Sequence, residues 1–405
     1  MLVLICCSHP AYPADSNRQV VVASAAHQNL IAKMERLIFD KLIKQAVDEI
    51  RTHPNRLQVL NQQLHKIDQA IRPPLLSSNQ QDQLALLNWL DQHPPGPGSA
   101  LDQSIARCAL ESQTPEPLYE WLEVELANLI AARTTRSDSL RQETQKTILA
   151  GIPSTRTAKH LVMSLLQDSL IQYIGLNVLQ LPLDDLDELV LEELNSNESD
   201  LPLFRYQADT QAMQVNLTGP PLIHFVELEA AALFYGVPGQ HFFHHLVKTN
   251  PVYRLTDCSA FAPAYAQYLL GLSGSASDDQ QNHALVSQQE FLISRLALAL
   301  ADLDLVVFGV EQTKVTDALS ERLLTPSARA QFEIRHLARQ PGQAFISAAI
   351  VRELIQLQQM AERQIGSNFQ LAEYLDRLNQ VISLPLPLIR EKMTLWINDH
   401  DPVAG

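Results

Sequence analysis

The chain is poor in glycine, with 13 residues in 405, and aromatic side chains make up only 6%. β-Sheets favour aromatic and β-branched residues, so this scarcity, with Leu, Ala and Gln dominant, favours helices over sheet. No uninterrupted apolar run reaches the roughly eighteen residues that a membrane-spanning helix needs. We therefore expect a mainly α globular protein without a membrane span.

Basic residues are also in short supply. Lys and Arg number 30 against 45 Asp and Glu, which gives a formal net charge of −15. Phosphate groups are bound by basic patches, and single-stranded nucleic acid also needs aromatic stacking platforms, for which three Trp are few. Nucleic acid and anionic membrane are therefore not expected as partners.

Only four cysteines are present, and two of them lie in the opening segment MLVLICCSHPAYPAD. An apolar run followed by Ala11 and Ala14 is typical of the end of a signal peptide whose basic start is missing. Cys6 and Cys7 suggest lipidation, but Ile5 stands where a small residue is needed. Residues 1–20 are thus predicted to be a truncated signal peptide of a periplasmic or cell-envelope protein. The alternative is a frayed apolar N-terminus of a cytoplasmic protein.

The remaining cysteines, Cys108 and Cys258, are too far apart in sequence for a zinc knuckle. They are expected to be buried thiols, and a single disulfide between them is the alternative. The sequence does not decide between the two.

Apolar residues recur at spacings of three and four along most of the chain, which predicts amphipathic helices. Residues 26–180 form a predicted N-terminal helical region, and residues 181–400 a second helical core. Acidic Leu183–Asp200 is interpreted as a solvated helix face and loop, and residues 211–218 as a strand. Helices are predicted over 28–52, 57–71, 79–93, 117–132, 139–150, 157–177, 222–235, 240–247, 259–272, 284–307, 343–365, 368–382 and 387–397.

The closing part of the chain carries a recognisable pattern. It contains Gln340-Pro341-Gly342-Gln343-Ala344, a helix, Leu384-Pro385-Leu386 and a final Trp396-Ile397. This order, together with the stretch 222–245, resembles the bacterial "domain of unknown function 885" family. Members of that family are largely helical, often exported and similar to zinc metallopeptidases. The resemblance implies a large helical zincin-derived fold, with the short β segment near the former metal-motif helix.

The family motif is His-Glu-x-x-Pro-Gly-His-His, which supplies imidazole ligands for a divalent metal and a carboxylate base. Aligned on Pro238-Gly239, most of these polar residues are replaced here. The same holds for a second carboxylate, a later His and a Tyr suited to an oxyanion. The degenerate positions are Phe234, Tyr235, Gln240, Pro263, Val306 and Ser347. Of the four polar residues of the His-Glu-x-x-Pro-Gly-His-His motif, only the histidine at His241 is kept.

These replacements imply a non-catalytic pseudoenzyme that needs no cofactor. Its ancestral cleft is expected to bind a peptide-like ligand or a protein partner. The candidate cleft residues are His241, His245, Tyr265, Asp302, Asp304 and Gln343. For the two aspartates the favoured interpretation is nevertheless a structural role, in which they meet Arg295, Arg335 or a helix N-terminus; a carboxylate facing the cleft is the functional alternative.

Two other functions stay open. His241 and His245 lie one helical turn apart, so a relocated zinc site with His224 and Glu227 would give a metal-dependent hydrolase or peptidase. A purely structural helical scaffold is the other hypothesis. It predicts no sizeable pocket between Tyr235 and Ser347.

Overall fold

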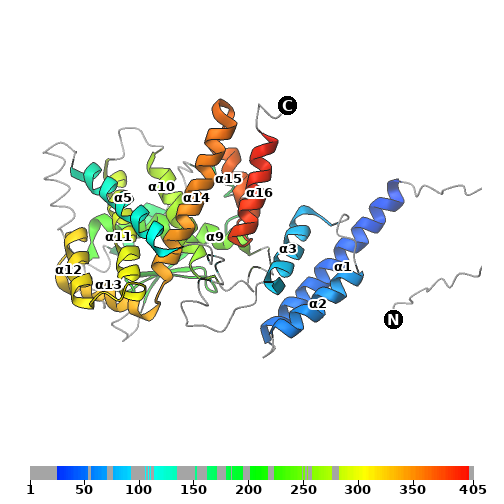
Figure 1. Cartoon of the computed structure of the whole chain (residues 1–405), viewed down its shortest axis with the longest axis horizontal. Coiled ribbons are helices and arrows are strands. Elements are labelled where there is room, and N and C mark those ends of the chain that lie inside the picture. Colours follow the sequence, from blue (N-terminus) through cyan, green and yellow to red (C-terminus); the bar gives the residue numbers. More distant parts are fainter. Residues whose placement is uncertain are drawn as a thin grey trace, which may run out of the picture.

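The computed structural model describes residues 25–52, 56–70, 76–92, 105, 108, 110, 114–134, 151–152, 162–170, 179–183, 185–194, 201–217, 223–248, 250, 253, 258–275 and 282–400. Over these residues the protein is mainly α, as the composition predicts, with two small sheets (Figure 1). None of the helices described is long and apolar enough to cross a membrane.

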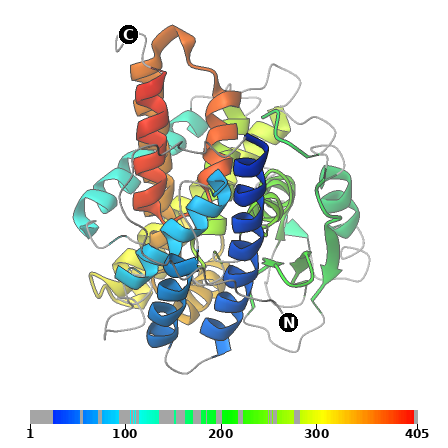
Figure 2. The same cartoon turned by 90° about the vertical axis from the view of Figure 1, so that its right-hand side faces the viewer.

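Three N-terminal helices lie together on one side of the molecule (Figure 1). An ion pair of 2.6 Å between Lys392 Nζ and Asp82 Oδ1 joins the third of them to the last helix of the chain. Figure 2 shows this group in front of the remaining helices. The three helices are α1 (Ala25–Thr52), α2 (Arg56–Ala70) and α3 (Ser78–Gln92).

The larger sheet has three strands in the order β2-β4-β3. Its central strand β4 (Ala212–Val215) confirms the strand predicted at 211–218, and it pairs antiparallel with β3 (Phe204–Gln207). The interpretation of 183–200 as a helix face and loop was wrong in part, because β2 (Val190–Glu193) pairs parallel with β4. Leu189 and Leu191 pack on the apolar cluster around β4, which outweighs the acidic composition of the segment.

A second, two-stranded sheet pairs β1 (Gly151–Ile152) with β5 (Ile223–His224). The helix predicted from residue 222 therefore begins at Phe225, after this strand pair. It is α8 (Phe225–Tyr235).

The long apolar helix predicted at 284–307 is α11 (Asn282–Val306), and it lies at the centre of the core. Residues such as Ile293, Ala297 and Leu300 are fully buried, which confirms the expected deep burial. Helices packed against α11 include α5 (Pro115–Thr134), α8, α10 (Phe261–Ser275), α12 (Gln312–Leu323) and α14 (Gln343–Ile365).

Further helices are α9 (Gln240–Val247), α13 (Ser327–Arg339), α15 (Leu371–Val381) and α16 (Leu386–Asp399). Residues 162–170 are also helical, within the helix predicted at 157–177. The bounds of α9, α15 and α16 agree with the sequence expectation to within a few residues, whereas no range was predicted for α12 or α13. The helix predicted at 139–150 lies outside the described residues, as do residues 1–20. Although α5 belongs to the predicted N-terminal region, it packs on α11 of the second.

The start of α14 is fixed by a carboxylate from α11. Asp302 Oδ1 accepts a hydrogen bond from the Gly342 N–H (2.9 Å), and Oδ2 accepts from Ala344 N (2.9 Å) and Phe345 N (3.3 Å). Gly342 has φ +87°, a left-handed conformation that glycine adopts without a Cβ penalty. Burial raises the pKa of Asp302 to about 6, although the three hydrogen bonds act to lower it. Asp302 thus binds a helix N-terminus, which is one of the structural roles expected for it from the sequence.

A disulfide joins Cys108 to Cys258, with Cα atoms 5.1 Å apart and a sequence separation of 150 residues. The sequence left this pairing open. Disulfides persist in oxidising compartments, so the bond is consistent with export to the cell envelope.

Breaking the disulfide should destabilise the protein strongly. Loop-closure entropy for this separation predicts a loss of about 5 kcal/mol in unfolding free energy for Cys108→Ala/Cys258→Ala. Urea unfolding followed by circular dichroism measures it. Adding reductant should destabilise wild type but not the double variant. A loss below about 1 kcal/mol would contradict the expectation.

Replacing Asp302 by Ala should leave three buried N–H groups at the start of α14 without an acceptor. We expect the unfolding free energy to fall by about 3 kcal/mol. Asp317→Ala, the same change at an exposed position of α12, serves as the control and should cost less than about 0.5 kcal/mol. Equal effects of the two variants in urea unfolding would rule out the capping role.

Candidate functional site

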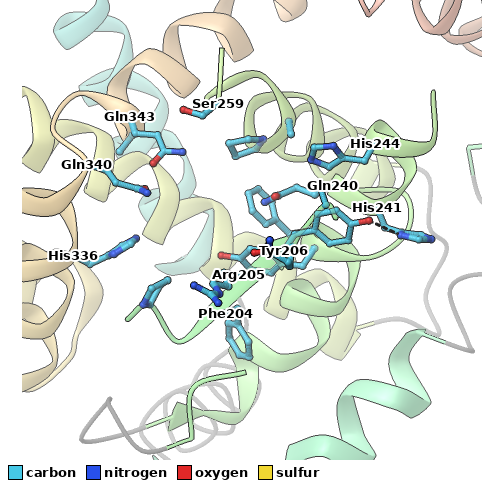
Figure 3. A pocket seen from close by; sticks show the side chains of 18 of the residues that line it. Phe204, Arg205, Tyr206, Gln240, His241, His244, Ser259, His336, Gln340 and Gln343 are labelled. Carbon is cyan, nitrogen blue, oxygen red and sulfur yellow. Dashed lines mark hydrogen bonds between the residues drawn. The ribbon is translucent and has the colours of Figure 1, made fainter. Parts of the chain in front are cut away.

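An open cleft of about 1300 Å³ lies beside the three-stranded sheet. One wall carries β3 and α9, and the other carries the end of α13 and the start of α14. Figure 3 shows Arg205 of β3 between His336 and Gln340 on one side and Gln240 and His241 on the other. Residues of α8, α10 and α11 also line it.

Four of the six degenerate positions line this cleft, namely Phe234, Tyr235, Gln240 and Pro263. The turn at 236–239 brings the first three together, because it links the end of α8 to the start of α9. The other two do not line the cleft. Val306 ends α11 half-buried, and Ser347 is fully buried in α14 with no hydrogen-bond partner for its Oγ among the residues described.

The candidate cleft residues divide in the same way. His241, His245 and Gln343 line the cleft. The other three lie elsewhere in the described fold: fully buried Tyr265 donates to Asn379 Oδ1, Asp302 binds the start of α14, and Asp304 interacts with Tyr119 and Arg322.

His241 is 1% exposed, and both of its ring nitrogens have partners. Nε2 lies 2.7 Å from the Asp187 carbonyl oxygen, and Nδ1 lies 2.9 Å from the Tyr206 hydroxyl (Figure 3). A carbonyl only accepts, so Nε2 carries the proton and neutral His241 accepts the Tyr206 proton at Nδ1. Burial lowers the pKa of His241, which favours this neutral form. A metal ion at either nitrogen would have to displace one of these hydrogen bonds.

The neighbouring His244 faces the cleft and stacks on Tyr206, with ring centroids 5.1 Å apart (Figure 3). Burial lowers its pKa to about 4, and His241 adds to the effect. His244 is therefore neutral at pH 7. The cluster 241–245 was visible in the sequence, but the contribution of Tyr206 from a strand 35 residues upstream of His241 was not.

A guanidinium stands at the position where the family motif begins. Arg295 of α11 lies over the Phe234 ring, with its Cζ 5.1 Å from the ring centroid, which is a cation–π arrangement. Burial lowers the pKa of Arg295, and its Nε has no hydrogen-bond partner among the described residues. From the sequence, Arg295 was expected only as a partner for the two aspartates, because nothing local in α11 indicates that it reaches a cleft.

The side chains at the motif positions do not fit a zinc ion. Phe234 offers no ligand atom, Gln240 is a poor ligand, and the Arg295 cation beside Phe234 would repel a dication. Among the residues described, no group of three or more His, Cys, Asp or Glu side chains is arranged to hold a metal. The side chains of His224 and Glu227 lie outside the described residues, so the relocated site that includes them stays a prediction.

Comparison with known proteins gives structural similarity alone. No family model matches the chain, and no curated protein does, so the resemblance to the domain 885 family stays a prediction. A "putative lipoprotein" from Colwellia psychrerythraea is similar with a TM-score of 0.60 and 13% identity, over 92% of this chain and 73% of that one. A second such lipoprotein of unknown function, from Shewanella oneidensis, gives a TM-score of 0.56 and 14% identity, over 91% and 73%. At these identities the likeness shows the fold.

The lowered pKa of His244 predicts acid sensitivity. The unfolded state takes up a proton near pH 6.5, whereas the folded state does so only near pH 4, so stability falls as the pH drops between these values. This residue should contribute a loss of about 2 kcal/mol between pH 7.5 and pH 5.

His244→Phe keeps a ring against Tyr206 but cannot titrate. The pH dependence of its unfolding free energy, measured in urea at both pH values, should be smaller than that of wild type by about this amount, 2 kcal/mol. An unchanged pH dependence would show that His244 is not the buried neutral group that the geometry indicates.

Proposed function

We propose that this protein is a non-catalytic binding protein, a pseudoenzyme resembling a metallopeptidase, whose cleft takes a peptide-like ligand. One observation carries the proposal. The cleft of about 1300 Å³ is lined at the degenerate motif positions by Phe234, Tyr235, Gln240 and Pro263, which supply neither a metal-binding set nor a carboxylate base. A cleft with neither a metal-binding set nor a base at these positions suits binding rather than catalysis.

The lining suits a peptide. Gln240, Gln340 and Gln343 enter the cleft from both walls (Figure 3). A carboxamide both donates and accepts hydrogen bonds, so it can pair with a peptide group. Tyr206, Tyr235 and Phe234 add aromatic surface on which apolar side chains can pack.

The scaffold hypothesis is disfavoured by the same cleft. That hypothesis predicts no sizeable pocket between Tyr235 and Ser347, whereas the open cleft is lined from Tyr235 to Ala344 and has a polar surface. The relocated metal site is opposed by the hydrogen bonds that occupy both nitrogens of His241.

We further propose that the protein works in the cell envelope. The Cys108–Cys258 disulfide and the apolar start of the sequence support export. The description of the two similar structures as lipoproteins points the same way.

The proposed peptide binding is tested by blocking the cleft with a large side chain. Ser259 lies exposed at the cleft, so Ser259→Trp should fill its entrance, whereas Ser367→Trp places the same side chain at an exposed position of the 3-10 helix 366–368, away from it. We expect wild type and Ser367→Trp to retain peptides from a random pool of mixed composition, and Ser259→Trp to retain at least about tenfold less, the loss expected when a buried contact surface is removed.

Turnover is measured on the same pool with and without added zinc. We expect none in either case. Zinc-dependent cleavage that disappears in His241→Ala would overturn the proposal and establish the relocated metal site. Equal retention by the two Trp variants would place peptide binding outside the cleft.

A further inference from the structure

The cleft carries a charge opposite to that of the molecule. Seven of its lining residues are Arg or Lys and three are Asp or Glu. The whole chain has 30 basic and 45 acidic residues, with a net charge of −15. The cleft therefore has a positive electrostatic potential although the molecule as a whole is negative. Protein walls of low dielectric constant focus this potential, so that it attracts anionic ligands.

Two of the three acids are already paired inside the cleft. Asp187 Oδ2 lies 2.8 Å from Lys248 Nζ, and Glu333 Oε1 lies 2.8 Å from Arg329 Nη2. The Lys248 contact lowers the pKa of Asp187, so this acid stays ionised and bound to its partner. The third acid, Asp209, is exposed. Lys248 and Arg329 are thus paired, whereas Arg205 and Arg295 belong to neither pair.

Arg205 and Arg295 have no carboxylate partner among the residues described. Arg205 donates from Nε to the neutral amide oxygen of Gln214 (2.6 Å), and Arg295 lies on the Phe234 ring. Glu333 attracts Arg295 only at longer range, because its own ion pair is with Arg329. A half-buried guanidinium without an anion is costly, and an arriving carboxylate would relieve that cost.

Uncharged polar groups surround these cations. The side-chain amides of Gln240, Gln340 and Gln343 make no hydrogen bond to other described residues. Half-buried His336 lies near Arg295 on the same side of the cleft as Gln340, and burial lowers its pKa, so it offers a neutral ring (Figure 3). Amides without a described hydrogen bond, next to guanidinium groups without a carboxylate partner, match a ligand that has both peptide groups and carboxylates.

We propose that the ligand of the cleft is an acidic peptide, whose carboxylates bind Arg205 and Arg295 while its backbone pairs with the three glutamines. This inference rests on the proposed peptide-binding function and goes beyond it by naming the ligand chemistry. The positive charge needed for recognition comes from fixed guanidinium groups of the chain itself.

The experiment compares two fluorescein-labelled octapeptides, one of alternating Glu and Ala and one of alternating Gln and Ala, in fluorescence anisotropy with the full chain. The Glu peptide should bind at least about tenfold more tightly, and this preference should shrink as salt screens the charges.

Arg205→Gln should remove most of the preference, and Arg295→Gln should remove the remainder if its thermal unfolding shows that it folds. Arg363→Gln makes the same change at an exposed position of α14 outside the cleft and should bind like wild type. The Arg205 and Arg363 variants have the same net charge, so any difference between them is local.

The outcomes separate the two proposals. Equal binding of both octapeptides that Ser259→Trp abolishes would overturn the acidic ligand and leave peptide binding intact. Binding of neither octapeptide would overturn the acidic ligand, and a failure to retain the random pool as well would overturn both proposals. Tight binding of an oligogalacturonate without binding of the Glu peptide would assign the arginines to an anionic saccharide and also overturn the inference.

Discussion

The buried carboxylate of Asp302 connects the centre of the core to the site. It lies on α11, the central helix, against which α5, α8, α10, α12 and α14 pack. It accepts hydrogen bonds from three backbone N–H groups at the start of α14. The first turn of a helix always leaves such groups without an internal partner. Because the acceptor comes from the central helix, the position of Gln343 in the cleft wall follows from the packing of α11. The left-handed Gly342 allows the chain to make this turn.

The opposite wall depends on the turn between α8 and α9. A Cβ at Gly239 would lie 2.0 Å from the carbonyl oxygen of Phe234, so only glycine fits this close approach of backbone to backbone. The turn places Phe234 under Arg295 and Gln240 at the cleft, and it begins the helix that carries His241 and His244. The stacking of His244 on Tyr206 and the hydrogen bond between His241 and Tyr206 then tie this helix to β3. The second hydrogen bond of His241 ties it to Asp187, in the segment before β2. The neutral histidines leave the positive charge of the cleft to its arginines and Lys248.

Most helices of this protein were predictable because their signal is local, although no range was predicted for α12 or α13. α9 and α14 have the predicted bounds, since a spacing of three and four apolar residues with Pro-Gly before the helix is a property of a short segment. β2 was missed because its acidic composition favours solvent, whereas its strand form depends on pairing with β4 about twenty residues later. Phe234, Tyr235, Gln240 and Pro263 were predicted together only through the family pattern, and the fold does bring them to one cleft.

The sequence by itself determined the mainly α class, the bounds of helices such as α9 and α14, and the clustering of histidines in α9. Each of these is composition or spacing within a few turns of helix. Only the tertiary structure decided that Asp302 binds a helix start rather than the cleft, that Cys108 meets Cys258, and that Arg205 and Arg295 gather in one basic cleft of an acidic protein. These are encounters between side chains far apart in the chain. They follow from how the helices pack around α11, which local periodicity does not specify.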